Sequence, residues 1–390
     1  MRFNQVRGTL PRALFAGLST LAFALPALRA QQPSSDPAPL VASGHPWKSC
    51  PTPCPPECAT APTTQPPSAQ TPPVSPDTSA ALFAPSLAPG LSAGIGGEQV
   101  ALGSPGYVDS AIIRSQIRTR FDAAYGDNVP DRAEFFYAKC GAAGKKAGSG
   151  SLRAPGPPKC ETNIDYQDIS GYIEYAFAPR FSAFFEAPYR FLNPTINQNA
   201  DGFSDINAGF KFAVVNEQNQ VLTLQLRAYA PTGDAFKGLG NDHTTVDPAL
   251  LWYQALSDRL ALNGELRDWI PIGGTDFSGN IVRYGLALNY LLFTNQNFSI
   301  VPIGEVVGWT VLDGKELKVG NGFTTPPFAT INDAGGNTIV NAKVGVRFGF
   351  GGLEERGLLS RSDVYIGYGR ALTGDVWYKD ILRLEYRMRF

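Results

Sequence analysis

Long apolar runs and an excess of one charge are both missing from this sequence. After residue 30 no stretch provides the roughly 18 consecutive apolar residues that a membrane-spanning helix needs, which excludes a helical membrane bundle. Lys and Arg total 33 against 34 Asp and Glu, a formal net charge of -1, so the strongly basic surface of a nucleic-acid-binding protein is also missing. Met and His are scarce, with two of each.

Glycine and aromatic residues are plentiful instead. The chain has 41 Gly, 24 Phe and 15 Tyr, a composition that favours β structure with tight turns over long helices. We therefore expect an all-β fold.

Residues 1–30 have the layout of a cleaved secretory signal peptide. Arg2, Arg7 and Arg12 supply a positive start, residues 13–25 form an apolar stretch, and small residues follow at 26–30. A short membrane anchor is the alternative, but the apolar stretch is too short to span comfortably. We expect an exported protein.

Residues 31–105 form a Pro/Ser/Thr-rich segment that we predict to be a disordered tether outside the folded domain. Its Cys50, Cys54 and Cys58 could suggest a metal site, but no fourth ligand is near, and oxidised or inter-chain-linked thiols are favoured. Cys140 and Cys160 flank a Gly/Lys/Pro-rich stretch and are expected to staple a loop. Whether residues 80–105 enter the folded domain stays open at this level.

Residues 106–390 alternate apolar and polar side chains with period two, separated by Gly, Asn, Asp and Pro. Successive side chains of a strand point to opposite faces, so this pattern predicts strands with one apolar and one polar face. We count about twelve strands, an even number as in bacterial single-chain barrels. They lie near residues 113–125, 168–177, 181–191, 205–214, 222–229, 245–256, 259–270, 280–293, 298–311, 338–350, 362–372 and 376–390.

A soluble barrel or sandwich could show the same alternation. The number of strands exceeds what a small soluble barrel can bury, and aromatic residues gather at strand ends as in membrane girdles. The last predicted strand, Val376 to Phe390, ends on its apolar face, where Tyr386, Met388 and Phe390 resemble an assembly signal read by the barrel-assembly machinery. We therefore predict an antiparallel transmembrane β-barrel in the bacterial outer membrane. The predicted girdle residues are Tyr125, Tyr175, Tyr189, Trp252, Trp269 and Trp377.

The polar faces of these strands predict a charged lumen. Buried charges normally pair, so a salt-bridge lattice that fills the interior is the favoured interpretation, and a pore with a slight arginine excess for anionic or polarised solutes is compatible with it. The predicted lumen residues are Arg114, Arg118, Arg120, Asp122, Glu174, Glu186, Asp205, Arg227, Glu265, Arg267, Arg283, Glu305, Arg347, Arg383, Glu385 and Arg387.

Enzymatic chemistry has little support. His243 is the one histidine after the predicted tether and has no obvious serine partner, so a solvated loop histidine is the favoured interpretation. Gly-rich runs at 238–240 and 349–352 lack the context of a phosphate loop and are interpreted as turns. We expect no cofactor, metal site or catalytic residue.

Several segments together carry a family resemblance: GFSDINAGFK at 202–211, LRAYAPTGD at 226–234, YGLAL at 284–288, GYGRALTGD at 367–375 and RLEYRMRF at 383–390. Over about residues 109–390 the chain resembles outer-membrane barrels labelled transporters, which are related to the putative meta-pathway phenol-degradation barrels. The resemblance implies a channel for small solutes, aromatic compounds among them. A structural or anchoring barrel with an occluded lumen is the alternative.

Overall fold

The computed structural model describes residues 101–141, 156–295, 297–319, 329–351 and 361–390. The predicted signal peptide, residues 31–100 of the predicted tether and its three cysteines lie outside the described residues. Within the described part, no helix is long and apolar enough to cross a membrane.

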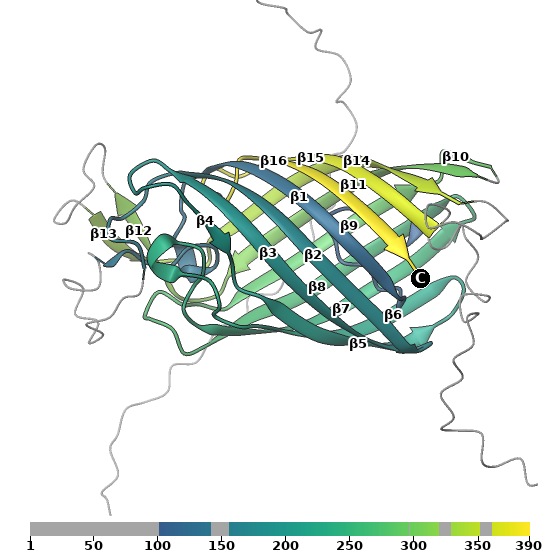
Figure 1. The fold of residues 1–390 in the computed structure, drawn as a ribbon, viewed down its shortest axis with the longest axis horizontal. Coiled ribbons are helices and arrows are strands. Elements are labelled where there is room, and N and C mark those ends of the chain that lie inside the picture. Colours follow the sequence, from purple (N-terminus) through teal and green to yellow (C-terminus); the bar gives the residue numbers. More distant parts are fainter. Residues whose placement is uncertain (1–100, 142–155, 296, 320–328, 352–360) are drawn as a thin grey trace, which may run out of the picture. The chain divides into compact units, whose positions relative to one another are not determined.

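Twelve antiparallel strands of the described chain close into a barrel (Figure 1). Consecutive barrel strands pair with each other, and the first pairs with the last, so the sheet has no open edge. The barrel strands are β1 Gln116–Asp127, β2 Ile164–Ala178, β3 Phe181–Pro194, β5 Asn207–Asn216, β6 Gln220–Tyr229, β7 Thr244–Ser257, β8 Leu260–Ile272, β9 Ile281–Tyr290, β11 Phe298–Val311, β14 Thr338–Phe350, β15 Ser362–Ala371 and β16 Asp380–Arg389.

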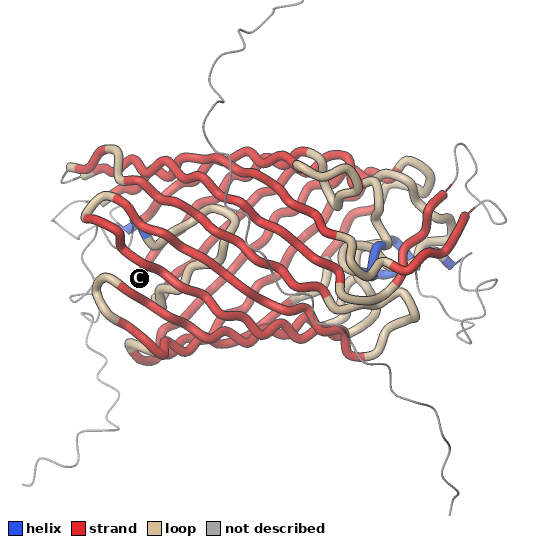
Figure 2. The backbone as a smooth tube through the Cα atoms, turned by 180° about the vertical axis from the view of Figure 1, so that it is seen from behind, coloured by secondary structure: helices blue, strands red, loops and turns tan. Residues whose placement is uncertain are grey.

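Short elements lie at the ends of the barrel. They are β4 Ala200–Phe203, β10 Phe293–Thr294, the hairpin of β12 Lys315–Val319 with β13 Ala329–Asp333, and the 3₁₀ turns η1 Arg132–Glu134 and η2 Ala235–Lys237. The tilted strands run along the whole barrel, and the longer loops gather at one end (Figure 2). At the other end β2 and β3, β5 and β6, and β7 and β8 are joined by two or three residues. This asymmetry is typical of outer-membrane barrels.

The outer face is apolar and the inner face is charged. Phe177, Leu286 and Val344 are 64%, 49% and 62% exposed, whereas Glu265, Arg267 and Arg347 are at most 2% exposed. A soluble protein would bury the first set and expose the second, so this surface is built to face lipid. The predicted fold class, an antiparallel transmembrane barrel of twelve strands, is confirmed.

The two ends of the predicted barrel differ from the sequence expectation. The first strand begins at Gln116 and not near Ile113, and the last begins at Asp380 and not at Val376. Ile113, Val376 and Trp377 are buried at 8%, 2% and 3% exposure. Apolar residues also occur here because these side chains pack inside the barrel. Periodicity alone does not distinguish an apolar side chain that faces lipid from one that is buried in the interior.

The predicted aromatic girdle is partly wrong. Tyr125 and Tyr175 are 48% and 47% exposed on the outer face. Trp269 and Trp377 instead turn inward and stack on Phe135. These two indoles close the loop-rich end of the interior rather than anchoring the barrel in lipid.

Candidate functional site: the barrel interior

Charged side chains from most barrel strands meet inside the barrel. Because alternate residues of a strand point inward, a run such as Arg118, Arg120 and Asp122 on β1 lines the interior with charge. Of the sixteen residues predicted to face the lumen, fourteen are buried at 9% exposure or less or have ion-paired side chains at most 22% exposed: Arg118, Arg120, Asp122, Glu174, Glu186, Arg227, Glu265, Arg267, Arg283, Glu305, Arg347, Arg383, Glu385 and Arg387.

Ion pairs link these side chains across adjacent strands and across strands separated by one other strand. Arg383 contacts Asp122 with two nitrogens, each 2.7 Å from a carboxylate oxygen, across the β1–β16 closure. Arg120 and Arg227 both approach Glu186, at 3.0 and 3.4 Å. Buried charges are tolerated only when paired in this way, and bidentate arginine–carboxylate contacts are the strongest of them.

A second group of ion pairs surrounds Glu385. Its Oε1 is 3.0 Å from Arg347 and 2.8 Å from Arg387, while Arg347 also pairs with Asp363. Glu385, Arg347 and Asp363 are each at most 3% exposed. Asp363 lies on β15, where the sequence pattern was blurred by glycine, and sequence reasoning missed it.

The chain immediately before the first strand also lies inside the barrel. We call residues 101–115 the plug segment. Leu102, Tyr107 and Ile112 are 2%, 4% and 1% exposed, and they pack against inward-facing side chains of the barrel. The sequence left open whether residues 80–105 enter the folded domain, and of these residues the structure places Leu102 and Ser104 in the buried interior.

Glu305 on β11 anchors the middle of the plug segment. Its carboxylate accepts hydrogen bonds from three successive backbone N–H groups, those of Gly106, Tyr107 and Val108, at 2.9 to 3.2 Å. A carboxylate that receives several N–H donors is stabilised as an anion without a paired cation. The sequence predicts that Glu305 faces the lumen. It does not predict these backbone partners, which lie 197 to 199 residues away in the chain.

Asp109 connects the plug segment to arginines of β6 and β8. Its Oδ2 is 3.1 Å from Arg227 and 2.6 Å from Arg267, and its N–H donates to Glu265 at 3.0 Å. Asp109 precedes every predicted strand, so the alternating pattern gave no signal for it. Its carboxylate contacts two guanidinium groups at once, an arrangement that binds an anion strongly.

Backbone carbonyls of the plug segment accept further hydrogen bonds from side chains that line the lumen. Arg347 donates to the carbonyls of Ser104 and Pro105 at 2.9 and 2.8 Å. Arg383 donates to that of Gly106 at 2.8 Å, and Arg283 to that of Tyr107 at 2.7 Å. Asn263 and Asn289 both donate to the carbonyl of Leu102. Several of the arginines predicted to line the lumen thus contact the plug segment.

The ring of Tyr107 lies between two cations. Lys343 Nζ is 3.9 Å from the ring centroid, and the Arg383 guanidinium is 4.0 Å from it. Cation–π contacts of this kind are strongest when water is excluded. Lys343 on β14 and Lys211 on β5 are not among the predicted lumen residues, although both are 3% exposed.

Aromatic side chains occupy the loop-rich end of the interior. Phe135, from the loop after β1, stacks between Trp269 on β8 and Trp377 at centroid distances of 3.7 and 4.1 Å. A disulfide between Cys140 and Cys160 closes the same loop, as the sequence predicts.

Ionisable groups hold the loops together outside the strands. Arg132 pairs with Glu316 of the β12–β13 hairpin at 2.6 Å, with both side chains at most 2% exposed. Asp131 Oδ1 accepts from the Leu317 N–H at 3.3 Å, and burial raises the pKa of Asp131 to about 7. Glu161 accepts from the Ile196 N–H at 2.7 Å, and burial raises its pKa to about 7 as well.

The other two predicted lumen residues, Arg114 and Asp205, do not lie on barrel strands. Arg114 belongs to the plug segment and donates to Gln116 and Ser104. Asp205 lies between β4 and β5, where it accepts from the N–H groups of Gly233 and Asn241 and so holds a loop. Tyr386 and Phe390 are 40% and 51% exposed on the outer face, with Met388 between them partly buried.

His243 is 6% exposed, and its Nδ1 lies 3.0 Å from the carbonyl of Asn241. The favoured interpretation of a solvated histidine is therefore wrong, because this ring is packed into the loop.

The sequence matches no family model, and no curated protein is significantly similar to it. Among solved structures, an outer-membrane channel of the COG4313 group from Pseudomonas putida F1 is similar at 15% identity and a TM-score of 0.44, covering 74% of this chain and 99% of that one. The KdgM porin is similar at 9% identity and a TM-score of 0.36, covering 70% and 99%. LpxR from Salmonella typhimurium is similar at 10% identity and a TM-score of 0.37, covering 71% and 100%. At these levels the likeness does not extend to function.

Proposed function

We propose that the protein is a bacterial outer-membrane channel for small solutes whose lumen is held closed by its own plug segment. The observation that carries this proposal is the contact between the plug segment and the barrel, in which many hydrogen bonds and several ion pairs accompany the apolar packing. Polar contacts of this kind can be exchanged for water or for a polar solute, whereas a fully apolar core could not be exchanged at comparable cost.

Anionic solutes are the class that the interior favours. Displacing Asp109 would leave the guanidinium groups of Arg227 and Arg267 without one of their carboxylate partners. An incoming carboxylate or phosphate could restore those contacts. Aromatic solutes are the second class, because the stack of Trp269, Phe135 and Trp377 offers flat surfaces to a ring.

Single-channel recording in planar bilayers tests the proposal. The wild-type protein should conduct rarely, and the double variant Asp109→Asn, Glu305→Gln should spend a larger fraction of time open, because both plug anchors lose their charge. Glu316→Gln is the matched control, since Glu316 is as buried but contacts Arg132 in the loops. Absence of conductance from both the wild type and the double variant at every voltage would rule out a channel.

The specific alternative is a structural barrel whose occluded lumen anchors the preceding chain at the envelope. The depth at which the plug segment is buried favours it. The same recordings separate the two functions, because an anchor remains closed after its plug contacts are weakened.

Ion selectivity addresses the solute class. In the open double variant, Arg227→Glu should shift the reversal potential toward cation preference, since Arg227 lines the path that Asp109 blocks. An unchanged reversal potential would assign Arg227 a purely structural role.

Location and assembly are part of the same proposal. We infer export through a cleaved signal peptide at residues 1–30 and insertion by the barrel-assembly machinery, which would read Tyr386, Met388 and Phe390 on β16 and its end. Deleting Phe390 should lower the amount of folded protein in outer-membrane fractions, and an unchanged amount would argue against this signal.

A further inference from the structure

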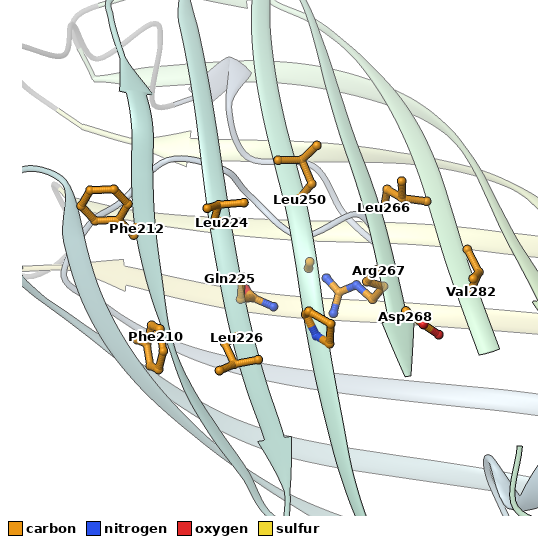
Figure 3. A pocket seen from close by; sticks show the side chains of 12 residues that line it. Phe210, Phe212, Leu224, Gln225, Leu226, Leu250, Leu266, Arg267, Asp268 and Val282 are labelled. Carbon is orange, nitrogen blue, oxygen red and sulfur yellow. The ribbon is translucent and has the colours of Figure 1, made fainter. Parts of the chain in front are cut away.

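A groove of about 590 Å³ lies on the lipid-facing wall of the barrel (Figure 3). Its walls are apolar side chains of β5 to β9, including Phe210, Leu226 and Leu266. Its volume falls within the range of small-molecule sites. The outer wall of a barrel is normally flat, so a groove of this size must arise from a local feature of the sequence.

The groove arises from one small side chain in a row of large ones. Residues directly opposite each other across the strands form a row of Phe212, Leu224, Leu250 and Leu266. The adjacent row begins with Phe210 and Leu226 and then reaches Pro248, whose ring is small. The large neighbours form the walls, and Pro248 with Ala249 forms the floor.

The backbone pairing between β7 and β8 is also interrupted at this point. β7 and β8 pair from Thr244 to Val246 and again from Ala249 onward, but Asp247 and Pro248 have no partner on β8. Proline has no N–H to donate, which accounts for part of the gap. The interruption lies directly beneath the groove.

Asp268 adds a carboxylate to this apolar groove. Arg267 points inward, so Asp268, its neighbour on β8, lies on the outer side (Figure 3). Its Oδ1 is buried without a hydrogen-bond partner among the described residues, and no ion pair of Asp268 is found among them. Ile272, further along the outer face of the same strand, is 57% exposed. A carboxylate within an apolar belt is costly, and such residues usually serve a ligand.

We propose that this groove binds a single-chain amphiphile with a protonated amine head, taken from the surrounding bilayer. The ammonium group would donate to Asp268 near the loop-rich end of the wall. The alkyl chain would lie along Leu266, Leu250 and Leu224, away from that end. This site lies on the outer wall and does not depend on whether the lumen conducts.

Charge decides between a cationic and an anionic head. Arg267 lines the same groove, but three carboxylates already contact it: those of Asp109, Asp247 and Glu265, at 2.6 to 3.0 Å. Asp268 has no such compensation. The groove therefore presents one uncompensated negative charge, which attracts an ammonium and repels a fatty carboxylate.

Photo-crosslinking of the full-length protein in lipid nanodiscs tests the site. The probes are photoreactive hexadecylamine, hexadecanol and palmitate, which share one chain and differ in the head. The amine should label the peptides of β7 and β8 about tenfold more than the alcohol, the value of one charge-assisted hydrogen bond, and the carboxylate least. Asp268→Asn should remove the preference for the amine.

Leu288→Asn is the matched control, because Leu288 is 46% exposed on the lipid-facing side of β9 outside the groove. It should leave the amine preference unchanged. Equal labelling of wild type by amine and alcohol would overturn the proposal, and this comparison needs no variant to fold. An amine preference that survives Asp268→Asn would overturn it as well.

Discussion

Tyr107 shows how a single side chain is held in the interior. Its ring lies between Lys343 and Arg383, while its hydroxyl has no hydrogen-bond partner among the described residues. The ring face, and not the hydroxyl, therefore carries the contact. A desolvated cation–π contact contributes up to about 2 kcal/mol, so two of them make Tyr107 a principal attachment of the plug segment.

Exchanging this ring for an aliphatic side chain should loosen the plug segment. We expect Tyr107→Leu to raise the open fraction in single-channel recordings, whereas Tyr107→Phe should behave like wild type because it keeps the ring. If Tyr107→Phe opened the channel as much as Tyr107→Leu, the hydroxyl and not the ring face would be the attachment.

At the scale of the element, the strands were the predictable part of the structure. Each strand has one face in lipid and one in a polar interior, so period two survives along its whole length. The plug segment was not predictable, because its partners are contributed by strands up to 277 residues away, as for Gly106 and Arg383. Trp377 was predicted to lie in the aromatic girdle, but it packs at the loop-rich end of the interior. An aromatic residue is common in both places, so its identity does not distinguish them.

The β12–β13 hairpin should respond to pH through Asp131. Burial raises the pKa of Asp131 to about 7, above the ~3.9 of an exposed aspartate. The neutral carboxyl is therefore favoured in the folded loops. Its contribution to loop stability is complete below about pH 4 and is lost as the pH rises to about 7.

Hydrogen exchange at the Leu317 amide, which donates to Asp131, measures this effect. After correction for intrinsic exchange, protection should fall between pH 4 and 7, roughly the interval between the two pKa values, and Asp131→Asn should flatten the curve. Protection that rises with pH in the wild type would contradict the assignment.

At the scale of the whole molecule, closure of the barrel depends on the contact between its first and last strands. Asp122 and Arg383 face each other in the β1–β16 register and share two hydrogen bonds. Removing one partner of a buried ion pair typically costs about 3–5 kcal/mol, because the other charge is left uncompensated.

Asp122→Asn should therefore lower the temperature at which the folded band on an unboiled gel converts to the unfolded one. Asp380→Asn, also on β16 but partly exposed and bonded to Tyr368, should have a smaller effect. Equal shifts for the two variants would mean that closure does not rest on this ion pair.

Glu305, Arg347 and Arg383 all contact main-chain atoms of residues 104–108, so the barrel recognises this stretch through its peptide backbone. These backbone contacts do not depend on side-chain identity, although the ring of Tyr107 adds its own contacts and an added methyl at Gly106 would collide with the ring of Tyr365. In chemical terms the interior is a receptor for an extended peptide. A synthetic peptide supplied in trans to a chain lacking its own plug would act as a removable blocker.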